Sequence, residues 1–273
     1  MTLRVGQIDY ANCTPLFACL KKFHDCRNYI FTHGTPSRLN SMLYNGEIDI
    51  CPSSSIEFAK YPQKYLILPN ISISSDLQVR SVLLFSLLPI EELNHQNVGV
   101  TGESATSVAL LKVILRRFYS YDNYYSKLDI PTVAALADYP AILLIGDTAL
   151  KGGIQRPQGV YVYDLGELWH RFTGLPFVFA LWLVRKETAI MQKSEVETLY
   201  SSLYHAKRMA SSCYEAIAKN CREDWISKND MIEYWNTISY DLTTRHIEGL
   251  QTFFRYSAES GLIDHEPELK IFG

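Results

Sequence analysis

The chain has 273 residues, of which 47% are hydrophobic and 20% charged, and its formal net charge is −3. This composition is ordinary for a water-soluble globular protein, and the length allows two modest lobes or one large domain. The weak negative charge gives no reason to expect nucleic acid as a partner. Small anions remain possible ligands, because backbone dipoles bind them whatever the overall charge.

The first ten residues, MTLRVGQIDY, lead directly into a strand, without a basic segment followed by an apolar one. No apolar run in the sequence is long enough to cross a bilayer. We therefore expect a cytoplasmic protein that does not associate with membranes.

The six cysteines form no CxxC pair, and the seven histidines form no HxxxH or HExxH group. Short motifs of that kind are the usual sequence signs of a metal site. We expect reduced, mostly buried thiols and no bound metal.

Short apolar or alternating runs predict strands along the first two thirds of the chain. These runs are Leu3–Ile8, Tyr29–Thr32, Ile48–Cys51, Tyr65–Leu68, Arg80–Pro89, Asn97–Thr101, Ala141–Ile145, Tyr161–Leu165 and Phe177–Val184. Apolar residues at helical spacing follow most of them, and the pattern from Glu187 onward is mostly helical. Alternating strands and helices predict an α/β protein with largely parallel sheets and ligand sites at the carboxyl ends of strands.

Two apolar runs organise this pattern. Arg80–Pro89 (RSVLLFSLLP) is too short for a buried helix and predicts a central strand, and Phe177–Val184 (FVFALWLV) is equally apolar. Two such crossings around an inserted α/β unit predict two lobes joined by two linkers, with a cleft between them. We expect residues 1–88 and 178–273 to form the first lobe and residues 89–177 the second.

Three polar turns share one design, in which a strand end is followed by small hydroxyl or amide side chains and then by a helix. They are Asn12–Thr14, Ser53–Ser55 and Ser104–Ser107, and Ser81 lies at the start of the first crossing. Such turns offer free backbone N–H groups at the positive end of a helix dipole. Each turn taken alone is explained more simply as a helix cap. Three of them at one cleft favour the binding of a small molecule with more than one carboxylate.

A general base is harder to identify. Asp147 follows the strand-like AILLIG and could act on a ligand or cap the next helix, and the residues leave both readings open. Asp49 alternates with apolar neighbours and is better explained as structural, and Arg80 as an exposed residue before a strand. The sequence holds no GxSxG motif and no P-loop. From the residues alone we predict a two-lobed binder of a small anion.

Several long strings resemble the chorismate dehydratases of the futalosine route to menaquinone. In order between residues 4 and 184, they are GQIDYANCTPL, GTPSRLNSMLYNGEIDICPSSSIEFA, RSVLLFSLLPIEEL, VGVTGESATSVALLKVIL, AILLIGDTAL and YDLGELWHRFTGLPFVFALW. The resemblance implies a two-lobed fold like that of type II periplasmic binding proteins. It also implies an enzyme, a hydro-lyase that converts chorismate to 3-[(1-carboxyvinyl)oxy]benzoate and water without a cofactor. The substrate's own enolpyruvyl carboxylate is then the implied base.

The same resemblance assigns roles to individual residues. Asn12 and Ser81 fall on the family's active-site asparagine and serine. The remaining candidates, all expected to bind the substrate, are Ser53, Ser54, Ser55, Thr101, Ser104, Thr106, Ser107, Gly146 and Asp147.

Two alternatives remain. A sister enzyme of the pathway, a dihydroxynaphthoate synthase, shares the fold. We expect it to begin with a string resembling CPNDTF, and the absence of that string here argues against this alternative. A non-enzymatic solute-binding protein for a small dicarboxylate is the second alternative, and the expected absence of a signal peptide counts against it. In either case we expect a small-molecule ligand and a monomer or homodimer.

Overall fold

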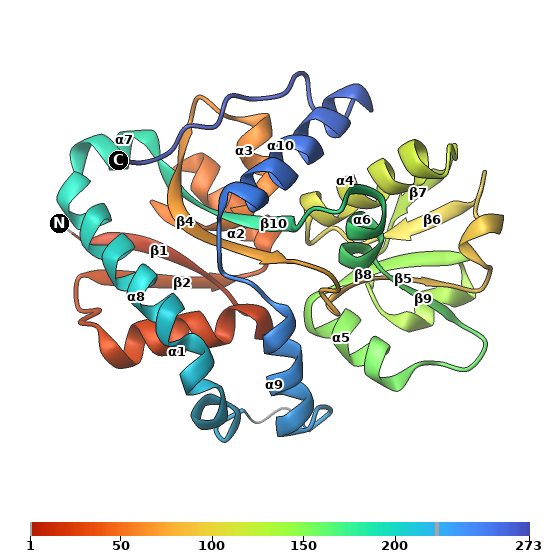
Figure 1. Ribbon diagram of the computed structural model, residues 1–273, viewed down its shortest axis with the longest axis horizontal. Coiled ribbons are helices and arrows are strands. Elements are labelled where there is room, and N and C mark those ends of the chain that lie inside the picture. Colours follow the sequence, from red (N-terminus) through yellow and green to blue (C-terminus); the bar gives the residue numbers. More distant parts are fainter. Residues whose placement is uncertain (1, 222–223) are drawn as a thin grey trace.

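The computed structural model describes residues 2–221 and 224–273 and places most of the strands in two five-stranded sheets (Figure 1). The first sheet has the order β2-β1-β3-β10-β4, and the second has the order β7-β6-β8-β5-β9. The strands are β1 (Leu3–Ile8), β2 (Tyr29–Gly34), β3 (Ile50–Ser54), β4 (Tyr65–Ser75), β5 (Val82–Ser86), β6 (Asn97–Val100), β7 (Tyr124–Lys127), β8 (Ala141–Ile145), β9 (Tyr161–Asp164) and β10 (Phe177–Arg185).

Both sheets mix parallel and antiparallel pairs. In the first sheet, β1 runs parallel to β2 and β3, whereas β10 runs antiparallel to β3 and β4. In the second, β6 runs parallel to β7 and β8, whereas β5 runs antiparallel to β8 and β9. The antiparallel strands β5 and β10 are the two apolar runs that the sequence analysis singled out. The predicted two-lobed α/β fold is confirmed, but the expectation of largely parallel sheets is wrong, because β5 and β10 run antiparallel to both of their neighbours.

The chain passes from the first sheet to the second between Ser75 and Val82, and returns between Thr173 and Phe177. The expected division at residue 88 left Val82–Ser86 with the first lobe, but this strand pairs with β8 and β9 in the second. All five of its residues are buried. An apolar sequence predicts that a strand lies in the centre of a sheet. It does not predict which of two sheets the strand joins.

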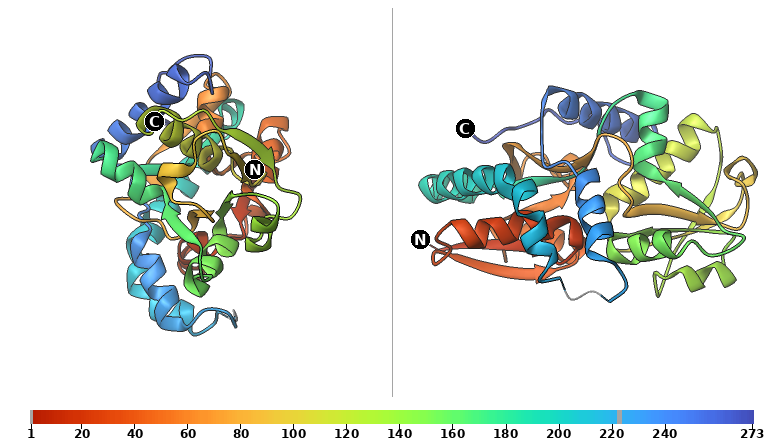
Figure 2. Two further views of the ribbon diagram at one scale, coloured as in Figure 1. Left: turned by 90° about the vertical axis from the view of Figure 1, so that its right-hand side faces the viewer. Right: turned by 60° about the horizontal axis from the view of Figure 1, so that its bottom comes forward.

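The helices cover the sheets and join the lobes. They are α1 (Thr14–Phe23), α2 (Pro36–Asn45), α3 (Ser55–Lys60), α4 (Ala105–Val113), α5 (Gly146–Gln155), α6 (Leu165–Thr173), α7 (Lys186–Met191), α8 (Lys193–Ala218), α9 (Lys228–Thr237) and α10 (Thr244–Glu259). Short helical turns lie at Ala11–Cys13 (η1), Ile90–Glu92 (η2), Ile114–Phe118 (η3) and Val133–Ala137 (η4). Figure 1 and the right-hand view of Figure 2 show α1 and α8 side by side on the first lobe. Helix α10 contacts β10 and α3 of the first lobe and α4 of the second.

Local sequence signals explain several helix ends. Pro15 and Pro36 each lie in the first turn of their helix, where the missing N–H costs nothing. Helix α2 ends at Gly46, whose φ of 77° favours glycine, as predicted. Asp49 is structural, also as predicted, because its carboxylate accepts hydrogen bonds from the backbone and guanidinium of Arg4.

Two strands extend furthest beyond their predicted ends. The third predicted strand extends as β3 to Ser54, so Ser53 and Ser54 lie in a strand and not in a turn. The fourth extends as β4 through Pro69 and Asn70 to Ser75. Asn70 has a positive φ of 59°, and the pairing of β4 with β10 shifts register around it. This bulge lets the strand continue past residues that usually end one.

None of the helices in the described ranges is long and apolar enough to cross a membrane. Cys13, Cys19, Cys51 and Cys213 are buried thiols, and Cys26 is a half-buried one. In the same part of the chain, no cluster of three or more His, Cys, Asp or Glu side chains could hold a metal ion.

Candidate active site

A small cavity of about 50 Å³ lies where the two lobes meet, and residues of both lobes line it. Six of the eleven candidate residues are among them, namely Asn12, Ser54, Ser81, Ser104, Ser107 and Gly146. We call this space the inner cavity. Its lining includes no charged side chain, so its polarity comes from hydroxyls, one amide, a phenol and backbone groups.

Asn12 lies in η1, between the end of β1 and the start of α1. Its amide oxygen is buried and has no hydrogen-bond partner among the described residues. A buried amide oxygen without a partner is costly in a folded protein, and such groups call for a specific explanation. A ligand that donates a hydrogen bond in the inner cavity would remove that cost.

Ser81 and Gly146 approach Asn12 from the second lobe. Ser81 is 1% exposed, and its hydroxyl makes a long 3.4 Å hydrogen bond to the carbonyl of Val79. The backbone N–H of Gly146 donates to the carbonyl of Ser81 at 2.8 Å and so ties β8 to the crossing segment. A side chain at Gly146 would be strained, because its φ is 61° and a Cβ would come 3.0 Å from the ring of Tyr10.

The serines at the end of β3 divide into two groups. Ser54 lines the inner cavity, whereas Ser53, also buried, lies 3.1 Å from the thiol of Cys51. Ser55 does not line the cavity. Its hydroxyl lies 3.3 Å from that of Thr106, across the junction of the lobes. Thr106 also accepts the backbone N–H of Ile56 at 3.1 Å, so this pair connects α3 with α4.

The turn before α4 is both a helix cap and part of the cavity wall. Ser104 accepts the backbone N–H of Ser107 at 3.3 Å, and the two hydroxyls lie 3.0 Å apart. The capping interpretation and the binding interpretation are therefore compatible. Thr101 accepts the N–H of Glu103 at 3.1 Å and lines a separate, larger cavity.

Asp147 holds the lobes together at the edge of this region. It accepts the backbone N–H of Ala11 at 3.0 Å and does not line the inner cavity. Nearby, the Tyr10 hydroxyl donates to Glu103 at 2.9 Å, and burial together with this carboxylate raises the pKa of Tyr10. Both bonds cross from the turn after β1 to the second lobe.

The C-terminal segment supports the Asn12 turn, which the sequence analysis did not predict. The indole of Trp235 donates to the carbonyl of Ala11 at 2.9 Å, and the hydroxyl of Tyr240 donates to the carbonyl of Asn12 at 2.7 Å. Both aromatic residues are buried. A dense group of Tyr and Trp in an otherwise polar segment, EYWNTISYD, was the available signal, because buried Tyr and Trp require polar partners.

Solved structures with this fold are distant in sequence. A protein from Archaeoglobus fulgidus superposes with a TM-score of 0.76 at 16% identity, covering 96% of this chain and 98% of its own. The periplasmic aliphatic sulphonate binding protein of Escherichia coli gives a TM-score of 0.70 at 14% identity, covering 98% of this chain and 90% of its own. At such low identities these similarities establish the fold alone, which is that of the periplasmic binding proteins.

Curated relatives are closer in sequence. The chorismate dehydratase of Thermus thermophilus is 34% identical over 197 residues, which cover 67% of this chain and 70% of that protein. The chorismate dehydratase of Campylobacter jejuni is 34% identical over 192 residues, covering 69% of this chain and 70% of that protein. The profile of the menaquinone biosynthesis family matches residues 3–259. The chain therefore belongs to the menaquinone biosynthesis family.

Proposed function

We propose that this protein is a chorismate dehydratase, which converts chorismate to 3-[(1-carboxyvinyl)oxy]benzoate and water. Two relatives that are 34% identical carry that activity in their names. The structural observation that supports the proposal most directly is the buried amide oxygen of Asn12, which has no partner among the described residues, in a cavity that Ser81 also lines.

The chemistry of the substrate matches an uncharged site. Chorismate carries two carboxylates, a ring hydrogen at C3 and a hydroxyl at C4. Loss of that hydrogen and hydroxyl as water makes the ring aromatic. The protein then needs mainly to orient the substrate and stabilise the charge that develops on the leaving oxygen.

No Asp, Glu or His lines the inner cavity. In the proposed mechanism, the substrate's own enolpyruvyl carboxylate therefore removes the proton at C3. As the C4–O bond breaks, the hydroxyl of Ser81 and the NH₂ group of Asn12 would donate hydrogen bonds to the departing oxygen, which leaves as water with the proton that the carboxylate took from C3. The helices α4 and α5 begin beside the cavity, next to Ser104 and at Gly146, so the positive ends of their dipoles would favour the substrate's carboxylates.

The first experiment is to incubate the purified protein with chorismate and separate the products by chromatography with mass detection. We expect a product lighter by one water with an aromatic ultraviolet spectrum. If chorismate is recovered unchanged, the dehydratase proposal is wrong. Unchanged chorismate together with a raised melting temperature would identify a binding protein instead.

The residue assignment is tested separately. We expect Asn12→Ala and Ser81→Ala each to lower kcat on the order of 100-fold, as the loss of a donor to developing charge does in other enzymes. Circular dichroism and melting temperature should show that both variants fold. If both retain the wild-type rate, Asn12 and Ser81 do not carry the reaction.

A further inference from the structure

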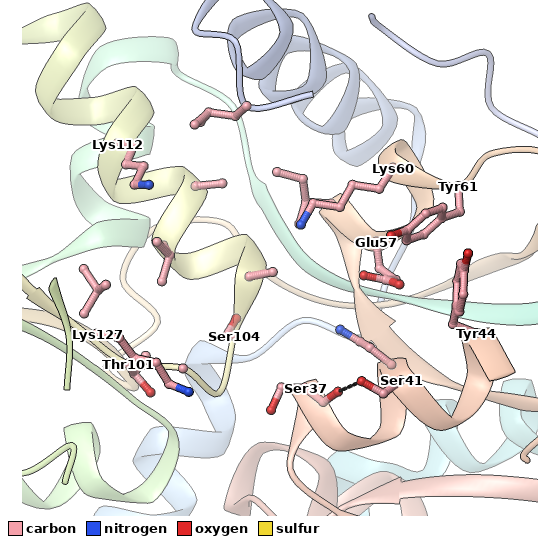
Figure 3. Close-up of a pocket in the computed structure, with 18 of the residues that line it drawn as sticks. Ser37, Ser41, Tyr44, Glu57, Lys60, Tyr61, Thr101, Ser104, Lys112 and Lys127 are labelled. Atoms are coloured by element: carbon pink, nitrogen blue, oxygen red, sulfur yellow. Dashed lines mark hydrogen bonds between the residues drawn. The ribbon is translucent and has the colours of Figure 1, made fainter. Parts of the chain in front are cut away.

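A second cavity, of about 660 Å³, lies between the lobes beside the inner one. Helices α2 and α3 form its wall on the first lobe, and α4 and the end of β7 form its wall on the second (Figure 3). Ser104 lines both cavities, so the two spaces adjoin at the N-terminus of α4.

The charges of this second cavity differ from those of the whole protein. Lys60, Lys112 and Lys127 line it together with one carboxylate, that of Glu57, which gives a local excess of two positive charges. The chain as a whole has a net charge of −3. We call this space the lysine cavity.

The three lysines come from separate elements, namely α3, α4 and β7. Figure 3 shows their side chains around the cavity, with Lys60 and Glu57 on the side of the first lobe. None of the three forms an ion pair within 4.0 Å among the residues that the structure describes. The three ammonium groups around one cavity repel one another, and the single carboxylate of Glu57, which interacts with Lys60, offsets only part of this charge, so an anion in the cavity is stabilising.

Asn40 supplies a second, independent sign of a ligand. This residue of α2 lines the lysine cavity and is 6% exposed, and its amide oxygen has no hydrogen-bond partner in the described chain. An amide oxygen accepts hydrogen bonds, so a ligand that donates one, such as the hydroxyl of chorismate, would satisfy it.

We propose that the lysine cavity captures the dianionic carboxylate substrate before it enters the inner cavity. This inference rests on the proposed dehydratase function. The inner cavity has no charged side chain in its lining, so the charged side chains that attract a dianion from solution must lie in its surroundings. A concave region lined by one sign of charge raises the local concentration of an oppositely charged ligand and its rate of association.

The test compares two triple variants with the same change in net charge. One is Lys60→Gln/Lys112→Gln/Lys127→Gln, in the lysine cavity. The control is Lys151→Gln/Lys219→Gln/Lys228→Gln, at exposed positions that do not line it. We expect the first variant to lower kcat/KM for chorismate on the order of tenfold at low ionic strength, and the control to leave it unchanged. Added salt should lower the kcat/KM of the wild type nearly to that of the lysine-cavity variant, because salt screens the charges of the lysines.

Glu57 gives a test of opposite sign. Glu57→Gln has nearly the same shape and removes the one negative charge of the cavity, so we expect kcat/KM to rise about twofold. Damage to the fold would lower kcat/KM and does not explain a rise.

The outcomes separate this inference from the proposed function. Equal kcat/KM values for the two triple variants would overturn the capture site and leave the dehydratase intact. A loss that appears in kcat alone would also overturn it. If the wild type turns over no chorismate, the proposed function fails. Calorimetry then measures whether the wild type and the two triple variants bind chorismate. Binding that only the lysine-cavity variant loses would support the site, and binding that both variants retain would overturn it.

Discussion

Ser53 and Ser54 are neighbours on β3 with different surroundings. Side chains of a strand alternate between its two faces, so Ser54 faces the inner cavity whereas Ser53 lies against the thiol of Cys51. We predict that Ser54→Ala lowers kcat/KM about tenfold, which corresponds to one lost hydrogen bond to a charged ligand. Steady-state kinetics with chorismate measures the effect.

Ser53→Ala is the matched control, since it removes the same hydroxyl one residue earlier on the same strand. We expect it to keep the wild-type kcat/KM, because Ser53 does not line the cavity. If the two variants behave alike, the division of these serines is wrong.

Residue types in the sequence indicated the lining of the inner cavity but not the direction of each side chain. The strand-to-helix pattern predicted polar turns around a cleft, and members of all three turns do line the inner cavity. It could not show that Ser55 and Thr106 bond to each other across the lobes. Tyr10 was missed, although it lines the cavity, because its partner Glu103 is distant in the sequence.

At the scale of elements, the segment after α9 holds the turn that carries Asn12. Tyr240→Phe removes only the hydroxyl that donates to the Asn12 carbonyl. We predict a loss of about 1 kcal/mol in the free energy of unfolding. We also predict a fall in kcat smaller than that of Asn12→Ala, because the turn loses one support and keeps its amide. Urea unfolding and steady-state kinetics measure the two effects.

Tyr121→Phe is the control for this prediction. Its hydroxyl donates to the backbone carbonyl of Glu91 at 2.9 Å, away from the cavity. We expect no change in kcat. A Tyr240→Phe enzyme with wild-type kcat would show that the C-terminal segment does not position Asn12.

The elements themselves were largely predictable, but their pairing was not. Apolar runs and helix signals located most strands and helices, because these depend on local spacing. The strand β7 was missed, since YYSK is short, polar and only partly buried. The sheet to which β5 belongs depends on contacts with β8 and β9, which lie some sixty and eighty residues later in the chain.

For the whole molecule, the ion pair between Arg4 and Asp49 makes stability depend on pH. Burial raises the pKa of the Asp49 carboxyl, but the hydrogen bonds from Arg4 outweigh it and lower the pKa below its usual 3.8. A carboxyl with a lowered folded-state pKa stabilises the fold above its unfolded-state pKa, and this stabilisation is lost as the pH falls through the folded-state value. We predict that Asp49→Asn costs about 2 kcal/mol at pH 7. The difference from wild type should shrink below pH 4, as measured by urea unfolding.

Asp25→Asn is the comparison for this effect. Asp25 also pairs with an arginine, Arg27, but on the surface, where solvent screens the pair. We expect little change in the free energy of unfolding at pH 7. A difference between Asp49→Asn and wild type that stays constant from pH 7 to pH 3 would contradict the linkage to Asp49.

The place of β10 in the first sheet also bears on how the chain is made. The strands of the second sheet, β5 to β9, come from one continuous stretch, residues 82–164. The first sheet has β10 inserted between β3 and β4, so it stays incomplete until residue 185 has been synthesised. During translation the lobe that begins the chain is therefore the second to be completed. Until then β3 and β4, which are largely buried in the finished fold, each keep an unpaired edge, so the nascent chain is most open to chaperones and to aggregation in that interval.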